Sequence, residues 1–313
     1  MTGPRTVLLL LALAITAPAQ AQLDPRDEWA VDLTTDYPMW ETANLTYRTA
    51  SNVDLKLDVY APQPLSAPNP TVLHIHGGGW VEGSRQVDTV ALIPYLARGF
   101  TVVNVSYRLG RVALAPAAVE DVRCALRWVV LNADKYKFDL DRIVTTGASA
   151  GGHLALTTAF LRPSDGFDAT CPTVDDKRWS SGEEPPMKVA AAVNWFGITD
   201  VADLLDGPNA KHYAIEWLGS LPSRRELARA VSPLSMVRAG LPPVLSIHGD
   251  ADELVPYSHA TRLHQALDKA GVPNRLVSIQ KGGHGDFTRE QQRANFAAIF
   301  AFLGERGLLP KGR

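Results

Sequence analysis

The most constraining feature of the sequence is a serine flanked by glycines where a strand-like run meets a helix-like run. The segment IVTTGASAGGHLAL places β-branched residues before Gly147-Ala148-Ser149-Ala150-Gly151 and an Ala/Leu-rich stretch after it. A strand that turns directly into a helix forces the central residue into a strained backbone conformation, and glycines two positions to either side avoid a clash. Ser149 is therefore predicted to be an exposed, reactive nucleophile.

Strand-like and helix-like segments alternate along most of the chain. The runs TVLHIH, TVVNVSY, VAAAVNW and VLSIH are almost continuously apolar, as strands buried on both faces are. Residues 114–133 carry apolar side chains three and four positions apart, which predicts a helix, and further helices are expected over 150–161, 257–270 and 288–305. This alternation predicts an α/β fold with a mostly parallel central sheet and helices on both faces.

The first 21 residues have the pattern of a secretory signal peptide. Arg5 precedes an apolar run over 7–17, and Ala19-Gln20-Ala21 matches a cleavage site. Eleven apolar residues in a helix reach about 16 Å, roughly half of a bilayer core, so a membrane anchor is the weaker interpretation. We expect cleavage after Ala21, a secreted or periplasmic mature protein, and no membrane span.

The remainder is expected to form one domain. Residues 22–44 are acidic, aromatic and loop-like, and are predicted to be an N-terminal arm, with the domain itself over 45–313. Irregular segments around 163–186 and 199–240 interrupt the alternation. Because ligands of open α/β sheets bind at the carboxyl ends of the strands, we expect these insertions to lie there as a small partial lid.

Charge and cysteine content exclude several classes of protein. The chain carries 31 Lys and Arg against 33 Asp and Glu, which lacks the basic excess of a nucleic-acid-binding protein. Its only cysteines are Cys124 and Cys171, and an oxidising compartment favours a disulfide between them. Neither lies in a cluster typical of metal ligands, so no metal or cofactor is expected.

A glycine-rich loop follows the predicted strand over 71–76. His76-Gly77-Gly78-Gly79-Trp80 contains three consecutive glycines, which suit a loop whose N–H groups approach a ligand closely. Acyl transfer requires such donors at the oxygen that becomes anionic, each worth about 3–4 kcal/mol. The N–H groups of Gly78, Gly79 and Ala150 are the predicted oxyanion hole, and His76 is predicted to orient the loop.

A nucleophilic serine also needs a base and an acid that orients it. Of the eight histidines, His284 alone lies on a glycine-lined loop after the last predicted strand, so it is the predicted base. The preceding strand ends in a loop with three carboxylates, Asp250, Asp252 and Glu253. Asp252 lies further round the loop and is the preferred acid, whereas Asp250 is expected to brace the turn.

Together these residues resemble the α/β-hydrolase family, and in particular its secreted esterases of the feruloyl-esterase-like and hormone-sensitive-lipase-like types. The resemblance rests on HGGGW at 76–80, SYRL at 106–109, GASAGG at 147–152, HGDADELVP at 248–256 and GGHG at 282–285. It implies Ser149, Asp252 and His284 as a catalytic triad, with the same oxyanion donors. It also implies a serine carboxylesterase of class EC 3.1.1 that works through an acyl-enzyme.

The substrate is less constrained than the mechanism. Small acyl or aromatic-acid esters are expected, including esters on plant polysaccharides. Trp80 and Trp195 are candidate substrate-binding residues, with ordinary core packing as an equal alternative for each. An arylformamidase or other amidase is the first alternative function, and a non-catalytic binding protein on the same scaffold is the second.

Overall fold

The computed structural model describes residues 38–172 and 186–311. The predicted signal peptide, most of the predicted arm and residues 173–185 of the first insertion lie outside this part of the chain. None of the helices within it is long and apolar enough to cross a membrane.

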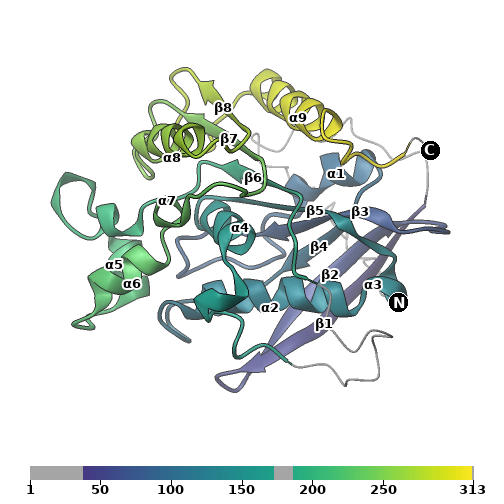
Figure 1. Cartoon of the computed structure of the whole chain (residues 1–313), viewed down its shortest axis with the longest axis horizontal. Helices are drawn as coiled ribbons and strands as arrows, with labels where there is room; N and C mark the ends of the chain where they lie inside the picture. The colour runs from purple at the N-terminus through teal and green to yellow at the C-terminus, as the bar shows by residue number, and fades with distance from the viewer. Residues whose placement is uncertain (1–37, 173–185, 312–313) are drawn as a thin grey trace, which may run out of the picture.

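A single eight-stranded sheet organises the described residues (Figure 1). Its spatial order is β1-β2-β4-β3-β5-β6-β7-β8. The first two pairs are antiparallel and the other five are parallel, which confirms the predicted mostly parallel sheet. In chain order the strands are β1 Met39–Ala50, β2 Val53–Pro62, β3 Asn69–Ile75, β4 Thr101–Val105, β5 Phe138–Ala148, β6 Ala191–Trp195, β7 Val244–Gly249 and β8 Asn274–Ile279.

Helices cover both faces of the sheet. The α-helices are α1 Ile93–Ala97, α2 Ala117–Leu131, α3 Ala133–Tyr136, α4 Ala150–Phe160, α5 His212–Leu218, α6 Arg224–Ala230, α7 Pro233–Met236, α8 Ser258–Lys269 and α9 Arg289–Gly304. Alternate residues of each strand enter different cores: Leu73 packs with α2, whereas Val72 packs with α1 and α9. Figure 1 shows the same division, with α1 and α9 on one side of the sheet and α2 and α4 on the other.

The first strand begins earlier than the sequence indicates. Residues 39–44 were expected to belong to the arm, but they are part of β1, and residues 39–42 pair with β2. The register shifts between Thr42 and Leu45, and Asn44 has a positive φ of 59°. This bulge breaks the alternation of side chains, which is the pattern that identifies a strand in a sequence.

The second insertion, 199–240, carries helices α5, α6 and α7, and α5 and α6 lie beyond one end of the sheet (Figure 1). Its anchor is aromatic. Trp217 of α5 is fully buried and stacks on Trp80 with ring centroids 4.2 Å apart. The indole N–H of Trp80 donates to His153 Nδ1 at 3.1 Å, and His153 Nε2 donates to the carbonyl of Val231 at 2.8 Å. The insertion is therefore packed on α4.

The first insertion is tied to α2. Cys124 and Cys171 form a disulfide, which confirms the predicted pairing. Beside it, the buried guanidinium of Arg123 makes two hydrogen bonds to the carboxylate of Asp168. Arg48 of β1 also donates to Thr170 at 2.8 Å. A covalent bond and a buried ion pair thus hold the same short segment on the outside of α2.

Removal of the disulfide is expected to destabilise the fold. The bridge joins residues 47 positions apart, so its loss frees a long loop in the unfolded chain. The double variant Cys124→Ala/Cys171→Ala should lose about 2–4 kcal/mol of unfolding free energy. Urea denaturation followed by circular dichroism measures this, with reduced wild-type protein as the control. Equal midpoints for oxidised wild type and the double variant would contradict the expectation.

The buried histidines predict how stability depends on pH. His153 is fully buried, and burial lowers its pKa to about 3. Below about pH 6.5 the unfolded chain binds a proton there that the folded chain does not. Stability should therefore fall as pH is lowered from 6.5 to 5. His153 contributes up to one proton to the slope of unfolding free energy against pH, which is at most about 1.4 kcal/mol per pH unit.

Urea denaturation at several pH values tests this expectation. The variant His153→Gln should lower this slope by up to one proton, and His212→Gln on the exposed face of α5 is the matched control. If the slope of unfolding free energy against pH is the same in wild type and in His153→Gln, His153 does not contribute to the pH dependence of stability.

Candidate active site

Ser149 occupies the predicted strained turn between β5 and α4. Its backbone angles are φ 55° and ψ −119°, in the positive-φ region that side chains avoid. A Cβ on Gly147 or Gly151 would lie 2.4 or 2.1 Å from the carbonyl oxygen of Ile75, so only glycine fits at either position. The N–H of Ser149 donates to the carbonyl of Trp195 at 2.9 Å. Packing against β3 and β6 therefore imposes the strain.

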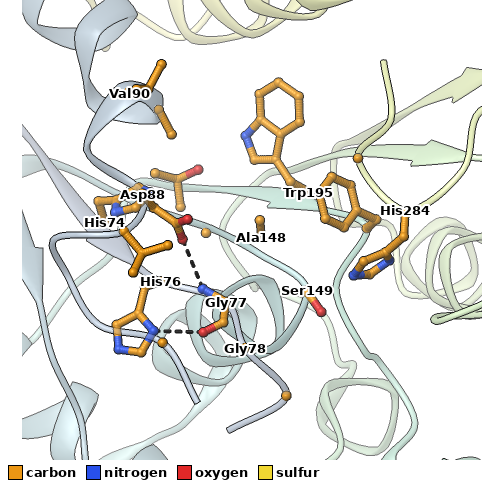
Figure 2. A pocket seen from close by; sticks show the side chains of 18 of the residues that line it. His74, His76, Gly77, Gly78, Asp88, Val90, Ala148, Ser149, Trp195 and His284 are labelled. Carbon is orange, nitrogen blue, oxygen red and sulfur yellow. Dashed lines mark hydrogen bonds between the residues drawn. The ribbon is translucent and has the colours of Figure 1, made fainter. Parts of the chain in front are cut away.

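The glycine loop that follows β3 lies beside this turn (Figure 2). Gly78 and Gly79 have φ values of 106° and 56°, and the N–H of Gly77 donates to Asp88 Oδ2 at 3.1 Å. Within the described residues, the N–H groups of Gly78 and Gly79 have no hydrogen-bond partner. Ala150 is the first residue of α4, so its N–H has no acceptor within the helix. These are the three donors that the sequence predicts for an oxyanion.

His76 supports the loop, as predicted. Its Nδ1 donates to the carbonyl of Gly77 at 2.7 Å, and its ring stacks on Tyr107 at 4.2 Å. Burial lowers the pKa of His76 to about 4, so the imidazole is neutral at pH 7. The hydroxyl of Tyr107 donates to the carbonyl of His76 at 3.1 Å, and this hydrogen bond also holds the loop in place.

Asp252 and His284 form a hydrogen-bonded pair. The distance from His284 Nδ1 to Asp252 Oδ2 is 2.7 Å. The other carboxylate oxygen accepts the N–H groups of Leu254 and Val255, each at 2.9 Å. The neighbouring Asp250 accepts the N–H of Lys281 at 2.6 Å, which is the turn-bracing role expected of it.

One residue of this arrangement escaped the sequence analysis. His248 is fully buried, and its Nε2 lies 3.2 Å from Asp252 Oδ2 and 2.9 Å from the carbonyl of Val255. Burial by itself raises the pKa of Asp252, but hydrogen bonds from His248 and His284 and the charge of His284 outweigh it and hold the pKa well below its usual range. The carboxylate is therefore ionised at pH 7. The apolar run VLSIH correctly predicted that His248 lies on a strand, but it did not indicate that the imidazole contacts Asp252.

Ser149 and His284 face the same cavity. Figure 2 shows them side by side, and both line a space of about 890 Å³. The described residues show no hydrogen bond between the two side chains, a contact that in unliganded enzymes is often long and tightens when substrate binds. Phe196 packs edge-on against the ring of His284 at 4.6 Å and limits its movement.

The structure separates the two candidate tryptophans. Trp195 lines the cavity with Phe196, but Trp80 does not. Trp80 has a positive φ of 63° and a fully buried side chain between His153 and Trp217, so its prediction as a substrate-binding residue is wrong. The cavity wall expected from Trp80 comes instead from Tyr213 of the second insertion and from Leu254. Tyr213 carries no local motif, since a distant segment brings it into place, and Leu254 lies within the HGDADELVP motif but was not singled out there.

Among the described residues, no group of three or more His, Cys, Asp or Glu side chains could hold a metal ion. The residues at the site offer a hydroxyl, an imidazole paired with a carboxylate, and backbone N–H donors.

A family model, several curated proteins and several solved structures are similar to this chain. The model of the BD-FAE family matches residues 57–267. The esterase LipC of Mycobacterium tuberculosis is 29% identical over 78% of this chain and 61% of its own length. The polyketide synthase ascC of Acremonium egyptiacum is 29% identical over 77% of this chain. The chain spans only 14% of that synthase's length, so it matches one part of it.

Two solved structures share most of the fold. A truncated carbohydrate esterase from gut microbiota is 28% identical, with a TM-score of 0.71 over 86% of this chain and 96% of that one. Esterase 2 of Thermogutta terrifontis phosphoramylated by tabun is 28% identical, with a TM-score of 0.70 over 87% and 97% of the two chains. The chain has the α/β-hydrolase fold and belongs to the BD-FAE family.

Proposed function

We propose that this protein is a serine carboxylic-ester hydrolase. The observation that carries the proposal is Ser149 on a strained turn, facing the same cavity as a histidine held by an ionised carboxylate. The esterase names of LipC and of the two structural neighbours support it. The neighbour modified by tabun supports a serine nucleophile, since organophosphorus compounds of that type react with activated hydroxyls.

Each step of the reaction falls to a residue of the site. His284 accepts the proton of Ser149 as the hydroxyl oxygen attacks the ester carbonyl. The N–H groups of Gly78, Gly79 and Ala150 stabilise the oxyanion. His284 returns the proton to the leaving alcohol and then activates the water that cleaves the acyl-enzyme. Asp252 keeps the proton of the neutral imidazole on Nδ1, so that Nε2 faces the serine, and stabilises the imidazolium.

The proposed substrates are small acyl or aromatic-acid esters, including those attached to polysaccharide. The cavity of about 890 Å³ that Ser149 lines has room for such an acyl group. The gut carbohydrate esterase supports the polysaccharide-linked class. Secretion or a periplasmic location is part of the same proposal, and the Cys124–Cys171 disulfide supports an oxidising compartment.

Loss of the Ser149 hydroxyl should abolish turnover. For Ser149→Ala we expect kcat for 4-nitrophenyl acetate to fall about 10⁴-fold or more, because no acyl-enzyme can form. Labelling by a fluorophosphonate should disappear as well, while Ser258→Ala at the exposed start of α8 retains both. Ester turnover that persists in Ser149→Ala would refute the proposal. Faster cleavage of N-formylkynurenine than of any ester would favour the amidase alternative.

The two neighbouring aspartates should differ sharply. Asp252→Asn is expected to lower kcat about 10⁴-fold, because the amide favours the wrong tautomer of His284. Asp250→Asn is the matched control, since an amide oxygen can still accept the N–H of Lys281. Initial rates with 4-nitrophenyl acetate compare them. A larger loss in Asp250→Asn than in Asp252→Asn would reverse the assignment of the acid.

A further inference from the structure

The cavity continues beyond Ser149 along one face of the sheet. Thr146 and Ala148 of β5 line it, as does His74 of β3. His74 pairs with Thr146 in the parallel ladder, three residues before Ser149. At 3.3 Å per residue, His74 lies about 10 Å from the nucleophile along the strand direction. The cavity is therefore long enough for an extended acyl group.

Most of this passage is apolar. Trp195 of β6, Val90 beside α1 and Phe296 of α9 line its sides. Its far end is different, because His74 and Asp88 both lie there, on the opposite side of Ser149 from His284 (Figure 2). An apolar passage that ends on two polar side chains predicts a ligand with a polar group at a fixed distance from the ester.

The hydrogen bonds around His74 determine which ring nitrogen carries the proton and which can accept a hydrogen bond. Its Nδ1 lies 3.0 Å from Asn104 Oδ1, while Asn104 Nδ2 donates to the carbonyl of Arg85 at 2.6 Å. The amide is therefore oriented with its oxygen toward His74, so Nδ1 carries the proton and Nε2 carries a lone pair. His74 is only 4% exposed, and burial lowers its pKa, which keeps the ring neutral.

Asp88 supplies a second acceptor. Its Oδ2 accepts the N–H of Gly77, and its Oδ1 has no hydrogen-bond partner among the described residues. No hydrogen bond or ion pair joins Asp88 to His74 there, although the charge of Asp88 acts to raise the pKa of His74. Both residues line the cavity, and among the described residues no hydrogen-bond donor is paired with His74 Nε2 or Asp88 Oδ1, so a ligand that donates would supply the missing partner.

The position of His284 identifies which half of an ester reaches this space. The leaving alcohol must lie next to His284, which protonates it. A group that extends to His74 and Asp88 runs in the opposite direction and is therefore part of the acyl half (Figure 2).

We propose that His74 and Asp88 form an acyl subsite that recognises a hydroxyl at the distal end of the acyl group. The subsite rests on the proposed esterase function and specifies the substrate class within it. A hydroxyl bound there donates a hydrogen bond to one of the two acceptors. A carboxylate in the same position is disfavoured, because it offers no proton at neutral pH and meets the charge of Asp88.

A set of three methyl esters tests the subsite on the purified full chain. Methyl hexanoate ends in a methyl group, methyl 6-hydroxyhexanoate adds the donor, and monomethyl adipate adds a carboxylate. We expect kcat/KM, measured by pH-stat at pH 7.5, to be about tenfold higher for the hydroxy ester than for hexanoate, the gain expected of a hydrogen bond to a buried or charged acceptor. The adipate should be hydrolysed more slowly than hexanoate.

Two variants divide the effect between the residues. His74→Leu removes the Nε2 acceptor at similar volume and should reduce the hydroxyl preference several-fold. Asp88→Asn keeps an oxygen for the N–H of Gly77 and removes the charge, so the rate with adipate relative to hexanoate should rise. His212→Leu, on the exposed face of α5, should keep both wild-type ratios. The ratio of kcat/KM between two esters does not depend on the fraction of the enzyme that is active. Fluorophosphonate labelling measures the concentration of active sites in each variant.

The outcomes separate the subsite from the esterase function. Turnover of 4-nitrophenyl acetate with no preference for the hydroxy ester would overturn the subsite and leave the function standing. Absence of both acetate turnover and fluorophosphonate labelling would overturn the function itself. A wild-type preference that survives both His74→Leu and Asp88→Asn would place recognition elsewhere. Should His74→Leu fail to fold, the adipate ratio of Asp88→Asn decides.

Discussion

Backbone-to-backbone packing at the end of β3 is the constraint on which the rest of the site depends. The carbonyl of Ile75 occupies the space in which a Cβ of Gly147 or Gly151 would lie, and a Cβ on Gly77 would lie 3.0 Å from the carbonyl of Ala148. The glycine loop and the nucleophile turn therefore touch without side chains between them. Because both positions are set by one sheet edge, the oxyanion donors and the Ser149 hydroxyl have a fixed relation before substrate arrives.

The electrostatics of the site follow from how completely Asp252 is bonded. Its carboxylate accepts from two backbone N–H groups, from His284 and from His248. A buried charge with this many donors remains ionised and cannot rotate, so it holds the imidazole of His284 in one orientation. His248 bonds to the same carboxylate oxygen as His284, so the position of the carboxylate is set partly by a residue that does not line the cavity.

Local patterns were enough to predict the parts of the molecule that local sequence determines. The runs of buried β-branched residues located the parallel strands, and the glycine spacing located the turn at Ser149. The choice of Asp252 over Asp250 followed from position along one loop, and the structure places Asp252 against His284. The beginning of β1 was missed, because the bulge at Asn44 erases the alternation that marks a strand.

The lining of the cavity depends on contacts that no local pattern records. Trp80 adjoins the oxyanion loop in sequence, but its positive φ turns the ring into the core against Trp217, more than a hundred residues later. Tyr213 enters from the same distant insertion and takes the place predicted for Trp80. The contact of His248 with Asp252 likewise depends on the path of a loop in three dimensions. Predicting these positions requires the packing of the insertion, which sequence spacing does not give.

Asp88 connects recognition of the acyl group to the oxyanion loop. One carboxylate oxygen accepts the N–H of Gly77, next to the two glycines that carry proposed oxyanion donors, and Asp88 also lines the cavity. In the proposed subsite, a hydroxyl bound at Asp88 orders the same carboxylate that positions the loop. Binding energy from a remote part of the substrate can then appear in kcat as well as in KM, because it stabilises the geometry that the transition state needs. An acyl group too short to reach Asp88 lacks this contribution even though it meets the same serine, histidine and backbone donors.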